Sequence, residues 1–171
     1  KRLPGAVSLS LDPEGESENF YADDIVYVVL NNNAGYEGDL ELALIPEEFL
    51  KDILHEEEDE NGVLLENANT TFERFALLFE FTGDQHAIRH VFYCCSASRP
   101  SQEGDTKEDE KEVKTEELSI IASALASGYV KAKSSVNTSK AVYDAWYDAV
   151  YMPPAEAPEE EEQGGNEEPN G

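Results

Sequence analysis

Residues 86–95 read HAIRHVFYCC, and the secondary structure of this stretch decides whether the chain is a candidate metal protein or a β-sheet protein. On a helix, His86 and His90 would lie one turn apart on one face, which is the spacing that two ligands of one zinc ion use. The turn residues Gly83 and Asp84 precede the stretch, however, and favour the start of a strand. On a strand, which rises about 3.3 Å per residue, the two histidines stand roughly 13 Å apart, too far to share an ion. The sequence therefore predicts a strand here and no metal site.

The same strand pattern recurs along the chain. Short runs rich in β-branched and aromatic residues alternate with turn signals built from Gly, Pro, Asn and Asp, which is typical of antiparallel sheets. Because Cys94 and Cys95 are adjacent, they should point to opposite faces of their strand and form no disulfide with each other. The predicted strands are residues 6–11, 24–30, 39–44, 62–66, 75–81, 87–97, 116–125 and 129–133.

The predicted strands differ in the faces that they can bury. The run DLELAL alternates, so Leu40, Leu42 and Leu44 should share a buried face while the acids between them face solvent. The runs DIVYVVL (24–30) and FALLFEF (75–81) are apolar on both faces. They should lie near the centre of a sheet or at an interface.

Two short helices should flank the strands. In IPEEFLKDIL (45–54), Pro46 and two glutamates suit the first turn, and apolar residues line one side. In TSKAVYDAWYDAVY (138–151), Thr138 is a candidate cap. The second helix should bury a face made of Val142, Ala145, Trp146, Ala149 and Val150, flanked by Tyr143, Tyr147 and Tyr151. The predicted fold class is mainly β, sandwich- or barrel-like, with one or two short flanking α-helices.

Polar segments divide the chain into a domain and a tail. Residues 152–171 combine Pro, Gly and acids with no large apolar residue after Met152, so we expect a disordered acidic tail. Residues 1–151 should form a single domain. The predicted polar connections are residues 14–24, 55–61 and 99–112, of which the last is long enough to be a functional arm or a mobile tip.

Composition argues against several functions. The formal net charge of the 171-residue chain is -26, whereas a protein that grips nucleic acid needs cations to displace the counterions of the phosphates. The chain contains no G-x-S-x-G nucleophile motif, no phosphate-binding glycine loop and no calcium-loop spacing among its acids. We therefore predict a protein that is not an enzyme and holds no cofactor or metal. No window approaches the roughly 20 apolar residues of a membrane span, so we expect a soluble protein with no membrane partner.

An ordered set of segments adds a family resemblance. LPGAVSLSLDPEGESENFYADD, NNNAGYEGDLELALIPEEF, FALLFEFTGDQ, RHVFYCCSASRP and AVYDAWYDAVYMP follow one another over about residues 3–153. Taken in this order, they resemble the major tail protein family of long-tailed bacteriophages (siphophages) and their prophages. Members of that family typically carry a further stretch before the LPGAVSL segment. Because Met152 is the only methionine, we expect residues before Lys1 in this protein too.

The resemblance implies a structural virion protein, the tail tube subunit, with a β-sandwich or barrel-like domain and a flanking helix. Such subunits assemble in the cytoplasm of the bacterial host into stacked hexameric rings. The rings surround the tape-measure protein, contact other tail proteins, and form a channel that viral DNA crosses during ejection without specific binding. An alternative from a different class is a monomeric β-sandwich binding or adhesion module, which should present an exposed aromatic platform.

A channel that passes DNA should repel phosphates, so acids on predicted strands are candidate lumen residues. The alternative is that these acids are solvated positions on the outer wall. The candidate lumen acids are Asp39, Glu41, Glu80, Glu116 and Glu117. The 99–112 segment is a candidate contact between rings, with Arg99, Glu103, Asp105, Lys107 and Lys111 as its charged residues.

Overall fold

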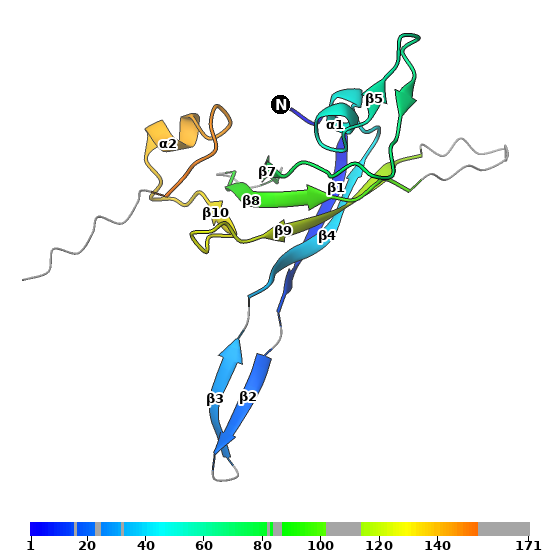
Figure 1. Cartoon of the computed structure of the whole chain (residues 1–171). Helices are drawn as coiled ribbons and strands as arrows, with labels where there is room; N and C mark the ends of the chain where they lie inside the picture. The colour runs from blue at the N-terminus through cyan, green and yellow to red at the C-terminus, as the bar shows by residue number, and fades with distance from the viewer. Residues whose placement is uncertain are drawn as a thin grey trace, which may run out of the picture.

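The computed structural model describes residues 1–15, 17–22, 25–31, 33–81, 83, 87–101 and 114–153. The predicted tail beyond Pro153, most of the 99–112 segment, and His86 lie outside the described residues. The protein is mainly β with two short helices, as the sequence predicts (Figure 1). Within the described part of the chain, neither helix has the length and apolarity needed to cross a membrane.

One curled antiparallel sheet of six strands forms the body of the protein. Two small two-stranded sheets and two helices are attached to it. The six strands are β1 (Ala6–Glu14), β4 (Gly35–Leu42), β7 (Phe75–Glu80), β8 (Arg89–Ala97), β9 (Glu116–Ser123) and β10 (Lys131–Lys133). The small sheets are β2 (Ser17–Ala22) with β3 (Ile25–Asn31) and β5 (Glu57–Glu58) with β6 (Leu64–Leu65), and the helices are α1 (Glu47–Asp52) and α2 (Lys140–Asp144).

Strand β8, which contains most of the HAIRHVFYCC stretch, pairs on both of its edges. β7 pairs with one edge, whereas the other edge is shared, because β9 pairs with residues 94–97 and β10 with residues 90–92. β4 and then β1 extend the sheet beyond β9. Among the described residues, no strand pairs with the outer edge of β1 or of β7. The sheet is therefore open on both sides.

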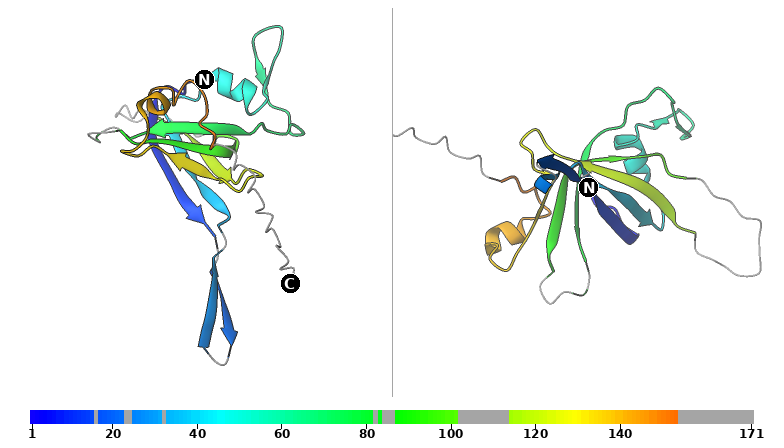
Figure 2. Two further views of the ribbon diagram at one scale, coloured as in Figure 1. Left: turned by 90° about the vertical axis from the view of Figure 1, so that its left-hand side faces the viewer. Right: turned by 90° about the horizontal axis from the view of Figure 1, so that it is seen from below.

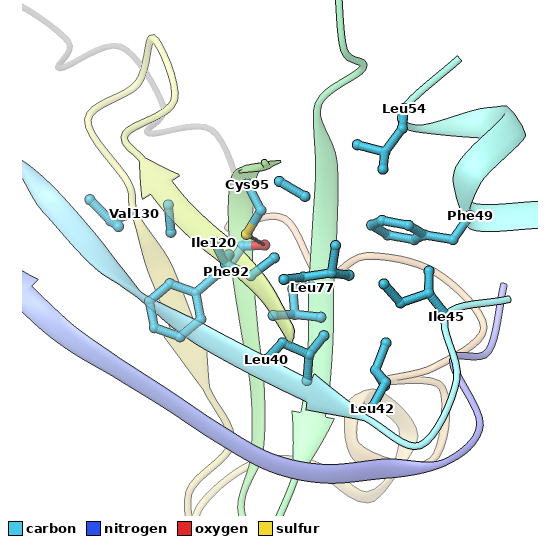
Figure 3. Packing of buried hydrophobic residues seen from close by; sticks show 13 residues of the cluster. Leu40, Leu42, Ile45, Phe49, Leu54, Leu77, Phe92, Cys95, Ile120 and Val130 are labelled. Carbon is cyan, nitrogen blue, oxygen red and sulfur yellow. Dashed lines mark hydrogen bonds between the residues drawn. The ribbon is translucent and has the colours of Figure 1, made fainter. Parts of the chain in front are cut away.

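The inner face of the sheet carries the main core (Figure 3). Leu40 and Leu42 of β4 point to the same side as Leu118 and Ile120 of β9, and all four are buried. Phe49 of α1 packs on this layer and closes one end of it. The predicted alternation of β4 is confirmed up to Leu42. Leu44 is instead 68% exposed, because β4 ends at Leu42 and the chain bends immediately after it.

A second cluster packs on the opposite face of the sheet. Trp146, just after α2, packs with Val91 and Tyr93 of β8, and Ala76 and Leu78 of β7 pack against this group. Of the two positions predicted for FALLFEF, the centre of a sheet is not observed, since β7 is an edge strand among the described residues, and the interface stays a prediction. Its two faces are nevertheless both covered, one by the main core and the other by this second cluster.

Helix α2 is shorter than its sequence predicts. Ser139, rather than Thr138, is the cap, and its hydroxyl accepts a hydrogen bond from the backbone N–H of Val142 at 3.4 Å. The helix ends early because Trp146 packs on β8, where its indole N–H donates to the carbonyl of His90 at 3.4 Å. The remaining members of the predicted apolar face are exposed; these are Ala145, Ala149 and Val150.

The β2–β3 hairpin projects from the end of the sheet (Figure 1 and the left view of Figure 2). Residues 14–24, predicted to be a polar connection, instead contain β2, which pairs with β3 in antiparallel register. The strand predicted over residues 24–30 is confirmed as β3. It is not central, because among the described residues it pairs only with β2. Its apolar sequence therefore belongs to a two-stranded ribbon, a structure that is marginally stable at best on its own in water.

The two faces of β9 provide a matched test of this fold. Leu118→Ala should destabilise the protein by about 2 to 5 kcal/mol, because it leaves a cavity in the main core. Leu118 is fully buried, whereas Ile121 on the opposite face is 48% exposed. Ile121→Ala should therefore change the free energy of unfolding by no more than about 0.5 kcal/mol. Urea unfolding of both variants measures the difference, and equal losses would contradict the assignment of the faces.

Candidate functional site

The outer face of β1, β4 and β9 is polar and rich in carboxylates. The register pairs Ser8, Ser10 and Asp12 of β1 with Glu41, Asp39 and Glu37 of β4. It also pairs Asp39 with Ser119 and Glu41 with Glu117 of β9. Because side chains alternate along a strand, these residues all lie opposite the buried leucines. We call this set the polar face; it comprises Ser8, Ser10, Asp12, Glu37, Asp39, Glu41, Glu117 and Ser119.

Hydroxyl groups orient two of these carboxylates. The Glu41 carboxylate accepts hydrogen bonds from the hydroxyls of Thr115, at 2.6 Å, and Ser8, at 2.8 Å. The hydroxyl of Ser119 donates to Asp39 at 2.9 Å. The bond from Thr115 and then that from Ser8 lower the pKa of Glu41, because both stabilise its charged form. Glu41 therefore stays ionised over a wider pH range than a free glutamate.

Like charges lie directly opposite each other on the polar face. Asp12 pairs with Glu37, and Glu41 pairs with Glu117. Such cross-strand pairs destabilise a sheet. The sequences of β1, β4 and β9 contain no Lys or Arg to offset the repulsion. A face that keeps repelling carboxylates at a cost to stability is a candidate functional surface.

The structure brings together three of the five acids predicted from the sequence. Asp39, Glu41 and Glu117 lie on the polar face. Glu116, the neighbour of Glu117, points to the opposite side of β9, where its carboxylate accepts a hydrogen bond from the backbone N–H of Ile45 at 2.6 Å. Glu116 thus holds the chain that enters α1.

Glu80 lies on β7, on the far side of β8 from β4. Its carboxylate pairs with the guanidinium of Arg89 at 3.1 Å. Arg89 also donates to the carbonyl of Tyr143 and stacks on the rings of Tyr143, at 4.0 Å, and Tyr147, at 5.0 Å. Burial, and then the nearby Glu80 carboxylate, raise the pKa of Tyr147 to about 12. This cluster fixes α2 on the sheet.

Two members of the polar face, Asp12 and Glu37, were not among the predicted acids. The signal was present in the sequence GYEGDLEL, where acids alternate at positions 37, 39 and 41. The predicted strand started at Asp39, two residues after Glu37, so the pattern was cut short. Asp12 lies one residue beyond the strand predicted over residues 6–11, and the turn residues Pro13 and Gly15 follow it.

Of the five charged residues predicted for the 99–112 segment, only Arg99 is described. Its guanidinium pairs with Glu66 at 2.6 Å, donates to the carbonyl of Asn67 at 3.2 Å, and lies over the ring of Phe72. Arg99 therefore anchors the start of the segment on the loop that precedes β7. The other four residues lie outside the described ones: Glu103, Asp105, Lys107 and Lys111.

A basic and aromatic surface lies on the inner face, beyond the part that α1 covers. The ammonium group of Lys131 is 4.2 Å from the ring centre of Tyr36 and 5.7 Å from that of Phe92. Lys133, two residues along β10, is in register with His90. We call this surface the lysine ledge; it comprises Tyr36, His90, Phe92, Lys131 and Lys133. The ring of Phe79 stacks on that of His90 and continues the aromatic row.

Covalent chemistry has little support among the described residues. Cys95 is fully buried, and burial raises the pKa of its thiol to about 12, so the thiol stays protonated at neutral pH. Cys94 is half-buried and points to the other face of β8, as predicted. In the part of the chain that the structure describes, no three His, Cys, Asp or Glu side chains are grouped as metal ligands would be.

Searches with protein-family models, among curated proteins and among solved structures found no match to this chain. The functional argument therefore draws on the resemblance of the ordered sequence segments and on the physical features of the molecule. These features are the open sheet, the polar face, the projecting hairpin and the lysine ledge.

The hydroxyl contacts of Glu41 make a prediction about its titration. The double variant Ser8→Ala/Thr115→Val should raise the pKa of Glu41 towards the ordinary value of 4.5, because it removes both donors. In the natural protein, the stability that this carboxylate contributes is present above pH 4.5 and is lost as the pH falls through its lowered pKa. Carboxyl NMR titration measures the shift. Ser10→Ala, which removes a hydroxyl that does not bond Glu41, is the control and should leave the titration unchanged.

Proposed function

We propose that this protein is a tail tube subunit of a long-tailed bacteriophage or prophage, which assembles into stacked hexameric rings around a channel for DNA. The proposal rests on the resemblance of the ordered sequence segments. One structural observation carries it further, namely an open antiparallel sheet with one apolar face and one carboxylate-rich polar face. In this role the protein acts by self-association and not by catalysis.

The two open edges of the sheet support self-association. The outer edges of β1 and β7 present backbone N–H and C=O groups, which are ready templates for pairing with another chain. If β1 of one copy pairs with β7 of the next, the contact is heterologous, which means that it joins two different surfaces. Such contacts form a ring when the rotation that relates one copy to the next closes on itself. On the edge strand β1, Val7 is an apolar side chain that is 57% exposed. A neighbouring copy would cover it.

The polar face supports the assignment of the channel wall. A ring of copies that turns this face inward repeats Glu37, Asp39, Glu41 and Glu117 around the bore. Phosphates within about a Debye length, ~8 Å at physiological salt, would be repelled rather than held. DNA could then pass quickly. The like-charge pairs on this face, which weaken the isolated sheet, would thus serve the assembled channel.

The projecting β2–β3 hairpin supports contacts between rings. It extends well beyond the sheet (Figure 1) and has a mostly apolar sequence in β3. A ribbon of two strands gains stability when a further surface packs on it or pairs with its edge. A copy in the adjacent ring would supply such a surface. The hairpin thus joins the 99–112 segment as a candidate inter-ring contact.

Electron microscopy of the purified protein tests the proposal. We expect rings or tubes as the protein concentration rises. Val7→Lys should raise the concentration needed for assembly by about tenfold or more, because a lysine on an edge strand opposes pairing. Val136→Lys is the matched control, since Val136 is 89% exposed in a turn away from both edges. Monomers of the natural chain at high concentration would contradict the proposal.

If the polar face lines the bore, replacing its acids with lysines should make the bore retain DNA. Tubes of the double variant Asp39→Lys/Glu117→Lys should retain DNA inside the channel at about physiological salt, because each copy adds cations to the wall. Glu57→Lys/Glu60→Lys makes the same change in net charge at exposed acids outside the polar face and should retain no DNA in the bore. Cryo-electron microscopy of tubes incubated with DNA distinguishes the two. DNA on the outer wall of the first variant would place the polar face outside.

The alternative, a monomeric binding module, draws on the aromatic row beside the lysine ledge. Tyr36 and Phe79 are half-buried in this row and Phe92 is buried, whereas Phe81 is 54% exposed. A module of this kind should bind a ligand without association that depends on concentration. Light scattering alongside a thermal-shift screen of carbohydrates separates the two functions. A ligand that stabilises a strictly monomeric protein would favour the alternative.

A further inference from the structure

The lysine ledge carries two ammonium groups that have no carboxylate partner among the described residues. Lys1, Lys51, Arg89, Arg99 and Lys140 each form an ion pair with a carboxylate. Lys131 and Lys133 form none with the described residues, although the chain carries 38 acids against 12 Lys and Arg. Both lysines are exposed. They leave a positive surface on a strongly negative protein.

The aromatic rings beneath the lysines fix this positive charge in place. Lys131 lies over Tyr36 and Phe92, whose ring centres are 5.0 Å apart in an edge-to-face contact. Burial and then the charges of Lys133 and Lys131 lower the pKa of His90, so this histidine is neutral at pH 7. The ledge therefore offers two exposed ammonium groups to a ligand. An acidic peptide segment is the chemistry that fits.

The C-terminal end of the described chain packs on the face of the sheet opposite the ledge, where Lys133 also lines a hollow. A hollow of about 270 Å³ is lined by Lys133, Thr138, Ser139, Val142, Trp146 and Tyr151. Tyr151 stacks on Trp146, with ring centres 5.7 Å apart, so the chain leaves the domain next to Lys133. Because an extended chain spans at most about 3.5 Å per residue, Glu156 can lie up to roughly 10 Å from Pro153, the last described residue. The next acids, Glu159–Glu162, extend that range.

The C-terminal segment of the same chain is favoured as the ligand of the lysine ledge by its negative charge and by its covalent connection to the domain. Residues 154–171 contain seven acids and no Lys or Arg, so the polar face and the acidic loops repel them. A segment on the same chain also acts at an effective concentration on the order of millimolar, far above that of another molecule in dilute solution. We propose that the acidic C-terminal segment, through Glu156 and Glu159–Glu162, docks on the lysine ledge of its own chain. An acidic segment of another molecule then has to displace it before it can reach the ledge.

NMR spectroscopy of the full chain tests the docking. In a variant carrying Glu156→Gln and Glu→Gln at positions 159–162, the backbone amide signals of Lys131, Ala132 and Lys133 should shift. The same signals should shift in the natural chain at about 0.5 M salt, where the Debye length is only a few ångströms. The control is Glu167→Gln/Glu168→Gln, which changes the same segment farther from Tyr151 and should have less effect. No shift in the first variant would overturn the proposal.

Zero-length carbodiimide cross-linking distinguishes docking within one chain from docking between copies. In a dilute mixture of ¹⁵N-labelled and unlabelled protein, cross-links from Lys131 or Lys133 to residues 156–162 should join peptides of the same label. They should exceed those from Lys51 and Lys140 by about fivefold, because the latter lysines already have carboxylate partners. Cross-links spread evenly over the lysines would overturn the proposal. Mixed-label cross-links would also overturn it and would assign the ledge to a second copy. Neither measurement needs tube assembly, so its outcome is independent of the proposed function.

Discussion

The burial of β8 on both faces and its pairing on both edges is the constraint on which the rest of the structure depends. Phe92 and Cys95 face the main core, whereas Val91 and Tyr93 face the second cluster under Trp146. Because β9 and β10 share one edge of β8, the chain between them must turn tightly, and Gly128 provides the positive φ of +84° that this turn uses. The two helices are short because each covers only part of one face of the sheet around β8.

The division between the two faces of β4 and β9 links the fold to the proposed function. One face holds leucines and isoleucine that provide the burial on which folding depends, and the other holds carboxylates that oppose one another. Gly38 of β4 lets β1 approach closely, since a Cβ atom at this position would lie 1.9 Å from the carbonyl oxygen of Ser10. This close approach brings Ser8 within hydrogen-bond reach of Glu41. The sheet thus orders its charges through hydroxyl donors rather than through cations, and its surface stays negative.

The sequence predicted the elements whose burial follows from local alternation. All eight predicted strands are present, and α1 lies within its predicted range, because the apolar pattern of each is visible in its local sequence. The errors arose where packing comes from distant residues. FALLFEF is apolar on both faces because Trp146 lies over it, and no local pattern carries that information. β2 was missed because Ser17, Glu18 and Asn19 have low strand propensity, and their pairing depends on β3. Register, and not composition, decides which face an acid occupies, so the sequence could not show that Glu116 and Glu80 lie apart from the other three lumen candidates.

The charge of the chain constrains how copies could associate. Each copy carries a formal charge of -26, so two copies repel each other at long range and attract only through short-range contacts. Backbone pairing at the edges of β1 and β7 provides such contacts, since N–H···O=C bonds do not depend on net charge. Packing of a neighbouring copy on the hairpin would provide others. A subunit of the proposed kind would remain separate at low concentration and associate when salt, concentration or a scaffold brings edges together. The repulsion that delays association is the same property that would leave a finished bore unattractive to DNA.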